Sequence, residues 1–200
     1  MNLPASREQR IELCMITTLD GAVDINGRSG PLGGRADQAH LMSLRSAADL
    51  VLVGAGTVRA EGYGVPSKKG LRIGIVTQSC DLDYSTALFT SGAGFIITTT
   101  TAREVPVESI RAGTSNVNFA VALAQLDAKI IHVEGGPQLN AALLEQDLVD
   151  AINLTFSPQL AGMRGLSMSQ APHIARRFKL VCVRDEDNCV FVRYERTTAV

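Results

Sequence analysis

The sequence lacks the signals that mark membrane, secreted and nucleic-acid-binding proteins. Its net charge is -1 over 200 residues, which gives no reason to propose a nucleic acid or an anionic membrane as partner. No apolar run approaches the roughly 18 residues of a transmembrane helix. The first ten residues lack the hydrophobic segment of a signal peptide. We therefore expect one globular domain of ordinary class.

Paired cysteines and several familiar catalytic motifs are also missing. The cysteines show no C-x-x-C spacing, so we predict reduced thiols of a cytoplasmic protein and no metal site. No G-x-G-x-x-G of the Rossmann kind and no G-K-[ST] occurs, which excludes a nucleotide-hydrolysing phosphate loop. No Ser-His-Asp set is recognisable, and we interpret the three histidines, including His132 in a strand, as structural. The cysteines are Cys14, Cys80, Cys182 and Cys189.

The most informative stretch that is present covers residues 130–144, I-I-H-V-E-G-G-P-Q-L-N-A-A-L-L. An apolar run ends on Glu134, and a helical pattern of leucines follows the glycines, which predicts a strand–turn–helix unit. Gly135 and Gly136 allow a sharp bend and close approach of a ligand. Pro137 suits the first helical turn, where free N–H groups form an anion site. The alternative is a tight turn that only packs a helix on a sheet.

A second unit of the same kind lies upstream. Residues 50–53 read as a buried strand, and Gly54-Ala55-Gly56-Thr57 follows directly. We expect Thr57 to cap the next helix, whose N–H groups can also receive a phosphate. Two such turns in one sheet predict a ligand with several phosphates that lies across the strand ends.

Strands and helices alternate over most of the chain. We predict one α/β domain over residues 1–200, with residues 1–10 as an N-terminal extension. Its sheet is mixed but mostly parallel, with helices on its faces and a C-terminal antiparallel hairpin around residues 185–188. We also expect Asp37 to cap a helix. The expected strands are 11–18 with a continuation at 22–25, 50–53, 72–77, 94–99, 117–121 followed by a helix at 122–127, 130–133, 151–157, 178–184 and 189–194.

Two glycine-rich loops and one arginine are each open to two interpretations. Residues 26–35, N-G-R-S-G-P-L-G-G-R, form either a mere connection or a lid over a ligand. Residues 62–70 form a second such loop, which carries two lysines. Arg45 lies beside the apolar stripe of its helix. It is either a solvated surface arginine or a guanidinium that clamps a phosphate.

Taken together, four segments resemble a known family. Thr18-Leu-Asp-Gly21, the Leu44-Arg45 helix, Val53-Gly-Ala-Gly-Thr-Val-Arg59 and Glu134-Gly-Gly-Pro137 occur in this order. The same order is found in the reductase domain of the bifunctional riboflavin-biosynthesis deaminase–reductase. The similarity runs from Ile11 to the final hairpin, and its loops look closest to a stand-alone actinobacterial branch. The deaminase half has no counterpart, because no H-x-E with a later P-C-x-x-C occurs.

The resemblance implies a dihydrofolate-reductase-like fold, a homodimer and NADPH as hydride donor. The implied reaction reduces the ribosyl group of a phosphorylated aminopyrimidine to ribityl. Glu61 and Glu134 are the catalytic candidates. Glu134 either accepts hydrogen bonds from the substrate or only pairs with a basic residue and stabilises its turn. The implied substrate contacts are Ser29, Arg45, Glu61 and Glu134, and the implied cofactor contacts are Thr17, Thr18, Asp20, Gly54, Thr57, Val58, Gln78, Gly135, Gly136, Pro137, Gln138 and Leu139.

One segment departs from the family pattern. The family usually carries D-D-P-x-L-T-x-R after the second glycine turn, and its arginine binds the substrate phosphate, whereas residues 61–69 read E-G-Y-G-V-P-S-K-K. The candidate replacements are Lys68, Lys69 and Arg72, although a lysine is a looser phosphate ligand than a forked guanidinium. Two other functions stay open. One is reduction of dihydrofolate or another pterin, with Glu61 or Asp20 facing the ring, and the other is nucleotide binding without catalysis.

Overall fold

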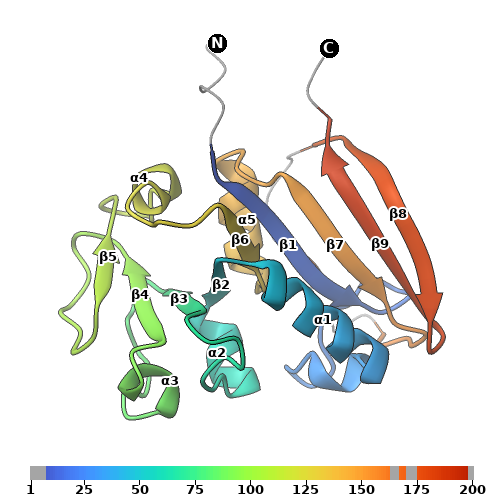
Figure 1. The fold of residues 1–200 in the computed structure, drawn as a ribbon, viewed down its shortest axis with the longest axis horizontal. Coiled ribbons are helices and arrows are strands. Elements are labelled where there is room, and N and C mark those ends of the chain that lie inside the picture. Colours follow the sequence, from blue (N-terminus) through green and yellow to red (C-terminus); the bar gives the residue numbers. More distant parts are fainter. Residues whose placement is uncertain (1–7, 163–166, 170–174, 198–200) are drawn as a thin grey trace.

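Short apolar runs along the chain form the strands of a nine-stranded sheet (Figure 1). The computed structural model describes residues 8–162, 167–169 and 175–197. The elements are β1 (Arg10–Thr17), the short 3-10 turn η1 (Gly30–Leu32), α1 (Arg35–Ala47), β2 (Leu50–Gly54), α2 (Ala55–Glu61), β3 (Arg72–Val76), α3 (Ala87–Thr90), β4 (Gly94–Thr98), β5 (Ser109–Arg111), α4 (Phe119–Leu123), β6 (Ile130–Val133), α5 (Pro137–Glu145), β7 (Ala151–Phe156), β8 (Phe178–Glu186) and β9 (Cys189–Arg196).

The sheet is parallel over most of its width. Its order is β5-β4-β3-β2-β6-β1-β7-β9-β8, in which β9 is antiparallel to β7 and β8 is antiparallel to β9. Strand β6 lies between β1 and β2, and Val133 pairs with Leu13 on one side and with Leu52 on the other. The α/β class, the mostly parallel sheet and the C-terminal hairpin are therefore as predicted. The insertion of β6 also brings the two glycine turns, after β2 and after β6, to neighbouring strand ends.

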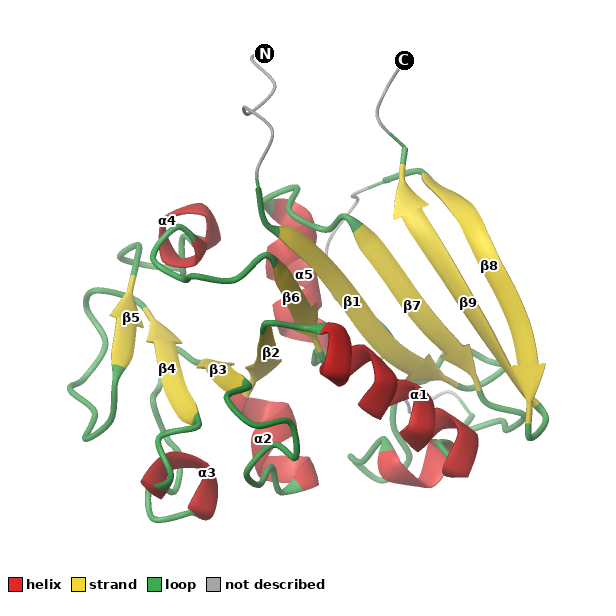
Figure 2. Ribbon diagram, viewed as in Figure 1, coloured by secondary structure: helices red, strands yellow, loops and turns green. Residues whose placement is uncertain are grey.

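Helices cover both faces of the sheet, with α1 in front of it and α5 behind it in Figure 2. One apolar core joins the sheet to α4 and α5, and a second lies on the other side of β2, β3 and β4. Gly74 in β3 is necessary for the first core. A Cβ there would lie 2.9 Å from Leu52 Cδ2 and 2.9 Å from Phe95 Cζ, closer than carbon atoms can approach.

Two of the predicted strands are wrong. Residues 22–25 do not continue β1, since Ile25 forms only an isolated bridge with Arg28. Residues 117–121 are not a strand, because α4 already begins at Phe119, and its N-cap Asn118 accepts a hydrogen bond from the Val121 N–H. Apolar runs this short fit a strand and a buried helical turn equally well.

Both predicted side-chain caps are wrong as well. Helix α1 begins at Arg35 with Gly34 as its N-cap, and the carboxyl of Asp37 interacts instead with Thr155 of β7. Helix α2 begins at Ala55, directly after its N-cap Gly54, which leaves Thr57 inside the first turn. In both cases an extended glycine precedes the helix as its N-cap, and the polar side chain points at another element.

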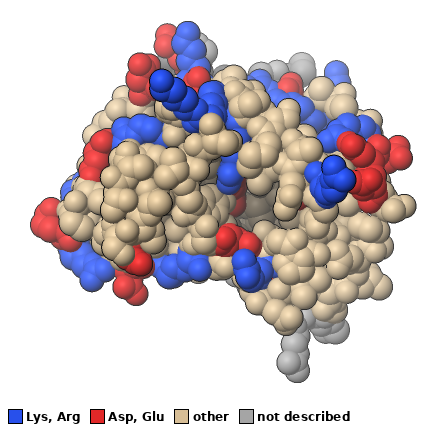
Figure 3. Space-filling view, turned by 60° about the horizontal axis from the view of Figure 1, so that its bottom comes forward, with Lys and Arg blue, Asp and Glu red and all other residues tan. Residues whose placement is uncertain are grey.

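The described part of the chain contains no helix with the length and hydropathy needed to cross a bilayer. On the face seen in Figure 3, basic and acidic side chains are interspersed, with wide uncharged stretches between them. No broad patch of one sign is visible there, in keeping with the net charge of -1.

Candidate active site

The two glycine turns meet at the carboxyl ends of β2 and β6. The Gly54 N–H donates a hydrogen bond of 2.6 Å to the Gly135 carbonyl, and the Glu134 N–H donates one of 2.9 Å to the Leu52 carbonyl. Gly135 has a φ of 70°, and a Cβ on it would lie 2.8 Å from Met15 Sδ. The bond between Gly135 and Gly136 is cis. Only glycine fits at residue 135, which explains the first glycine of the pair.

The second glycine borders a strip of bare backbone. Pro137 lies in the first turn of α5, as predicted, and Gly136 is the N-cap of this helix. The N–H groups of the next two residues have no acceptor within the helix and point out of its N-terminus. A Cβ on Gly136 would lie 2.9 Å from Thr57 Oγ1. Gly54, Thr57 and Gly136 therefore lie close together at the N-terminus of α5, and we call this strip of backbone with little side-chain bulk the crease.

Three other residues predicted to contact the cofactor form a closed turn after β1. The hydroxyl of buried Thr17 donates to the carbonyls of Thr18 and Ala22. The Thr18 hydroxyl donates to Asp20 and accepts from the Ala22 N–H. Together with the N–H groups of Ala161 and Gly162, the Thr18 hydroxyl holds the pKa of Asp20 below its ordinary value. These polar groups are satisfied within the protein, so any contact they make to a cofactor uses their remaining lone pairs.

The remaining predicted cofactor residues are spread along the strand ends. Leu139 is buried beside Gly54, so its side chain belongs to the core and only its backbone can face a ligand. Gln78 follows β3 and donates to the Ser115 carbonyl and to Asn116 Oδ1. Val58 packs against the second core, and Gln138 is exposed on the first turn of α5.

Beside the crease, Glu134 and Arg45 form a buried ion pair. Arg45 Nε and Nη2 each donate a 2.6 Å hydrogen bond to the Glu134 carboxylate, whose side chain is only 5% exposed. Burial alone raises the pKa of Glu134, but the hydrogen bonds and charge of Arg45 outweigh it and keep the pKa below its ordinary value. Arg45 is thus no solvated surface residue, and Glu134 does pair with a basic residue.

Two side chains in this cluster have no signal in the sequence that marks them as site residues. The Tyr63 hydroxyl donates to Glu134 Oε2 at 2.5 Å, and His132 Nε2 lies 3.4 Å from Glu134 Oε1. His132 is buried, as predicted, but it faces the ion pair as well as the core. Tyr63 lies in the irregular loop after α2, where no periodicity indicates which way a side chain points.

Ser29 and Glu61, both predicted to contact the substrate, meet in a second cluster. Glu61 Oε1 at the end of α2 accepts hydrogen bonds from the N–H of Ser29 at 2.5 Å and from its hydroxyl at 2.9 Å. Arg28 Nε lies 3.9 Å from the other carboxylate oxygen. The glycine-rich loop of residues 26–35 is therefore fastened to α2, as a covering over a ligand would require.

A cavity of about 220 Å³ lies between α1 and the loop of residues 62–70. Arg45 lines one side and Lys68 another, and the Lys68 ammonium donates to the Ala48 carbonyl at the end of α1. Arg72 cannot serve this cavity, because its guanidinium lies 4.5 Å from the Phe95 ring centroid and pairs with Glu108. The full lining is Met42, Arg45, Ser46, Pro66, Ser67, Lys68 and Leu71.

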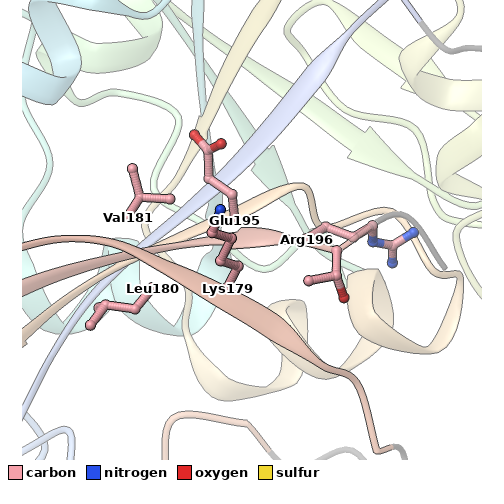
Figure 4. Close-up of a pocket in the computed structure, with 6 residues that line it drawn as sticks. Lys179, Leu180, Val181, Glu195 and Arg196 are labelled. Carbon is pink, nitrogen blue, oxygen red and sulfur yellow. The ribbon is translucent and has the colours of Figure 1, made fainter. Parts of the chain in front are cut away.

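A larger cavity of about 540 Å³ is far from these residues. It lies on the paired strands β8 and β9 (Figure 4), at the start of β8 and the end of β9. Strand β8 is the outer strand of the sheet, four places from β6. Within the described ranges, no three His, Cys, Asp or Glu side chains are grouped to hold a metal ion. The crease and the ion pair beside it thus remain the candidate active site.

Comparison with known families decides what kind of protein this geometry belongs to. The model of the RibD C-terminal domain matches residues 10–190. The chain belongs to the RibD C-terminal domain family. No curated protein sequence matches it. Membership in the RibD family confirms the family predicted from the four sequence motifs.

Solved structures of RibD-like proteins share the fold. A pyrimidine reductase-like protein from Corynebacterium diphtheriae is 25% identical with a TM-score of 0.84, over 96% of this chain and 93% of that one. RibD from Acinetobacter baumannii is 18% identical with a TM-score of 0.78, over 95% of this chain but only 58% of that one. The riboflavin biosynthesis reductase Rib7 from Saccharomyces cerevisiae is 18% identical with a TM-score of 0.75, over 98% and 93%.

Proposed function

We propose that this protein is the pyrimidine reductase of riboflavin biosynthesis. It uses NADPH to reduce the ribosyl group of 5-amino-6-(5-phosphoribosylamino)uracil to a ribityl group. The single observation that supports this most is the juxtaposition of the bare backbone crease at Gly136 with the Arg45–Glu134 pair, in a chain of the RibD family. The crease suits a dinucleotide, and the pair offers a fixed cation beside it.

The charge and the low side-chain bulk of the crease support cofactor binding there. The N-terminus of α5 attracts the pyrophosphate, and the glycines let it approach the backbone. The Thr57 hydroxyl lies next to Gly136, where it can donate to a phosphate oxygen. NADPH, when bound, supplies the hydride, and the protein orients the two reactants.

We propose that the substrate phosphate enters the cavity lined by Arg45 and Lys68. The two cations come from different elements, and each is anchored, Arg45 by Glu134 and Lys68 by the Ala48 carbonyl. Anchoring lowers the entropy lost on binding, which compensates for the weaker geometry of a lysine. Of the other two candidates, Lys69 is exposed outside the cavity lining and Arg72 is engaged by Glu108.

Reduction of a pterin has less support. Asp20 is held by Thr18, Ala161 and Gly162, and Glu61 is held by Ser29. Both carboxylates are thus engaged, whereas a pterin ring needs an acidic partner that faces it.

The test is NADPH oxidation at 340 nm with the aminopyrimidine and with dihydrofolate, side by side on one preparation. We expect turnover with the aminopyrimidine only. Turnover with dihydrofolate alone would establish the pterin reductase, and NADPH binding without turnover of either would establish a non-catalytic binding protein.

We also propose a homodimer in the cytoplasm. Strand β8 at the sheet edge exposes Leu180, Val181 and Val183, an apolar row that a second copy could cover. All four cysteines are free thiols, which suits a reducing compartment. Sedimentation of the purified protein at about twice the mass of one chain supports the dimer, and sedimentation as a monomer refutes it.

A further inference from the structure

Tyr63 contacts both members of the buried ion pair. It follows Gly62, which ends α2 in the left-handed conformation with a φ of 69° and turns the chain back toward β6. The hydroxyl donates to Glu134 Oε2 at 2.5 Å, and the ring centroid lies 5.4 Å from the Arg45 guanidinium carbon. The segment that departs from the family pattern thus supplies a side chain to the centre of the site.

The donors around Glu134 leave little room for a substrate. Oε1 accepts from Arg45 Nε and faces His132 Nε2, while Oε2 accepts from Arg45 Nη2 and from Tyr63. A carboxylate offers about four lone-pair positions, so the protein itself occupies nearly all of them. Glu134 is therefore better placed to hold Arg45 than to bind a substrate. The hydrogen bonds from Arg45 to Glu134 use Nε and Nη2, and Arg45 also lines the cavity that holds Lys68.

The charge states agree with this division of roles. Burial and the negative charge of Glu134 raise the pKa of Tyr63 well above its ordinary value, so the phenol remains a hydrogen-bond donor at neutral pH. Burial lowers the pKa of His132, which keeps that imidazole neutral. The remaining titratable neighbour is Cys14 of β1, whose thiol pKa burial raises. Arg45 is thus the one cation in direct contact with the Glu134 carboxylate among the described residues.

We propose that Tyr63 is a positioning residue of the reductase site, which fixes Arg45 through Glu134 in the orientation that binds the substrate phosphate. The inference rests on the proposed function, because it assigns Arg45 to the phosphate of the aminopyrimidine. Without the hydroxyl, Oε2 loses one of its two donors and the carboxylate can rotate, so the guanidinium no longer points steadily into the cavity.

The decisive variant is Tyr63→Phe, which keeps the ring over Arg45 and removes only the hydroxyl. We expect the KM for the aminopyrimidine to rise about tenfold, the size of effect expected for loss of one hydrogen bond to a charged group. The turnover number and the Kd for NADPH should stay within about twofold, since Tyr63 touches neither the crease nor α5 in this geometry. The matched control is Tyr84→Phe, whose hydroxyl donates to the Cys80 carbonyl away from the site and whose loss should leave KM unchanged.

Two further readouts separate positioning from simple stabilisation. Loss of the Tyr63 donor raises the pKa of Glu134, so the acid limb of kcat/KM should move to higher pH. In a double-mutant cycle, Tyr63→Phe should add almost nothing in a Glu134→Gln background, because both changes disturb the same carboxylate. An unchanged KM and acid limb, or fully additive effects in the cycle, would overturn the proposal.

Calorimetry with ribose 5-phosphate, without NADPH, keeps this test independent of the reaction. The wild type should bind the probe, and Tyr63→Phe should bind it about tenfold more weakly. If the wild type binds ribose 5-phosphate but fails to reduce the aminopyrimidine, the proposed function fails while the role of Tyr63 stands. If the wild type does not bind it, or if both proteins bind it equally, the role of Tyr63 is refuted.

Discussion

Replacement of Glu134 by Gln tests the ion pair at the centre of the site. The side chain keeps its shape but loses its charge, and its amide nitrogen meets a donor of Arg45 or Tyr63. Removal of one partner from a buried ion pair costs about 3–5 kcal/mol. The Arg45 side chain is 20% exposed, so water can solvate part of the freed charge, and we take the lower end, about 3 kcal/mol.

For a chain of 200 residues, about 3 kcal/mol corresponds to a fall in Tm of roughly 6–12 °C. The assay is thermal unfolding at pH 7, followed by kinetics at a temperature where both proteins are folded. We expect a lower Tm together with a raised KM and little change in the Kd for NADPH. The matched control is Glu108→Gln, which breaks an ion pair with Arg72 that is exposed and should cost less than about 1 kcal/mol.

The pH dependence follows from the lowered pKa of Glu134. A carboxyl group whose pKa is lowered by folding stabilises the protein fully above its ordinary pKa, near 4.5. That contribution is lost as pH falls from there through the pKa of the folded protein. The stability difference between the wild type and Glu134→Gln should therefore be constant near neutrality and shrink in acid. A Tm within about 2 °C of wild type at pH 7 would refute the reasoning.

Three more outcomes are expected. Gly136→Val places a branched side chain beside the Thr57 hydroxyl in the crease and should weaken NADPH binding at least about tenfold by calorimetry, without unfolding the protein. Arg45→Lys cannot keep two hydrogen bonds to the carboxylate and should raise the KM for the aminopyrimidine about tenfold while the Kd for NADPH is unchanged. Burial raises the pKa of Glu12, but Arg193 and Arg10 outweigh it and lower this pKa to about 2. Wild-type stability should therefore fall between about pH 4.5 and 2 as Glu12 takes up a proton, and Glu12→Gln should lack this part of the fall. Urea unfolding of both proteins at each pH measures the difference.

Much of the fold could be predicted, because the strands are encoded locally. The run 50–53 is followed directly by Gly54 and the run 130–133 by Glu134 and two glycines, and each run forms a buried parallel strand. The antiparallel pairing of β8 with β9 follows from the polar turn, where Asp187 and Asn188 both have positive φ values of 53° and 63°. The short segment 117–121 has no such turn signal after its apolar residues, and there the prediction failed.

The site could be predicted only in part, because its chemistry depends on long-range partners. The glycine pair and Arg45 carry recognisable patterns, but the partner of Arg45 is 89 residues away in the sequence. The Tyr63 hydroxyl meets Glu134 over 71 residues, from a loop without periodicity. The sequence shows that a charged side chain is present, but only the folded structure shows which residue pairs with it.

The position of β6 between β1 and β2 has a consequence for the order of folding. Among the described residues, β1 pairs with β6 and β7 alone, so in a nascent chain it has no described strand to pair with until residue 130 has been made. The crease also needs Gly54 and Gly136, and the ion pair needs Arg45 and Glu134. Under the proposed function, neither ligand can therefore stabilise an early folding intermediate, and we expect NADPH binding to report completion of the central sheet.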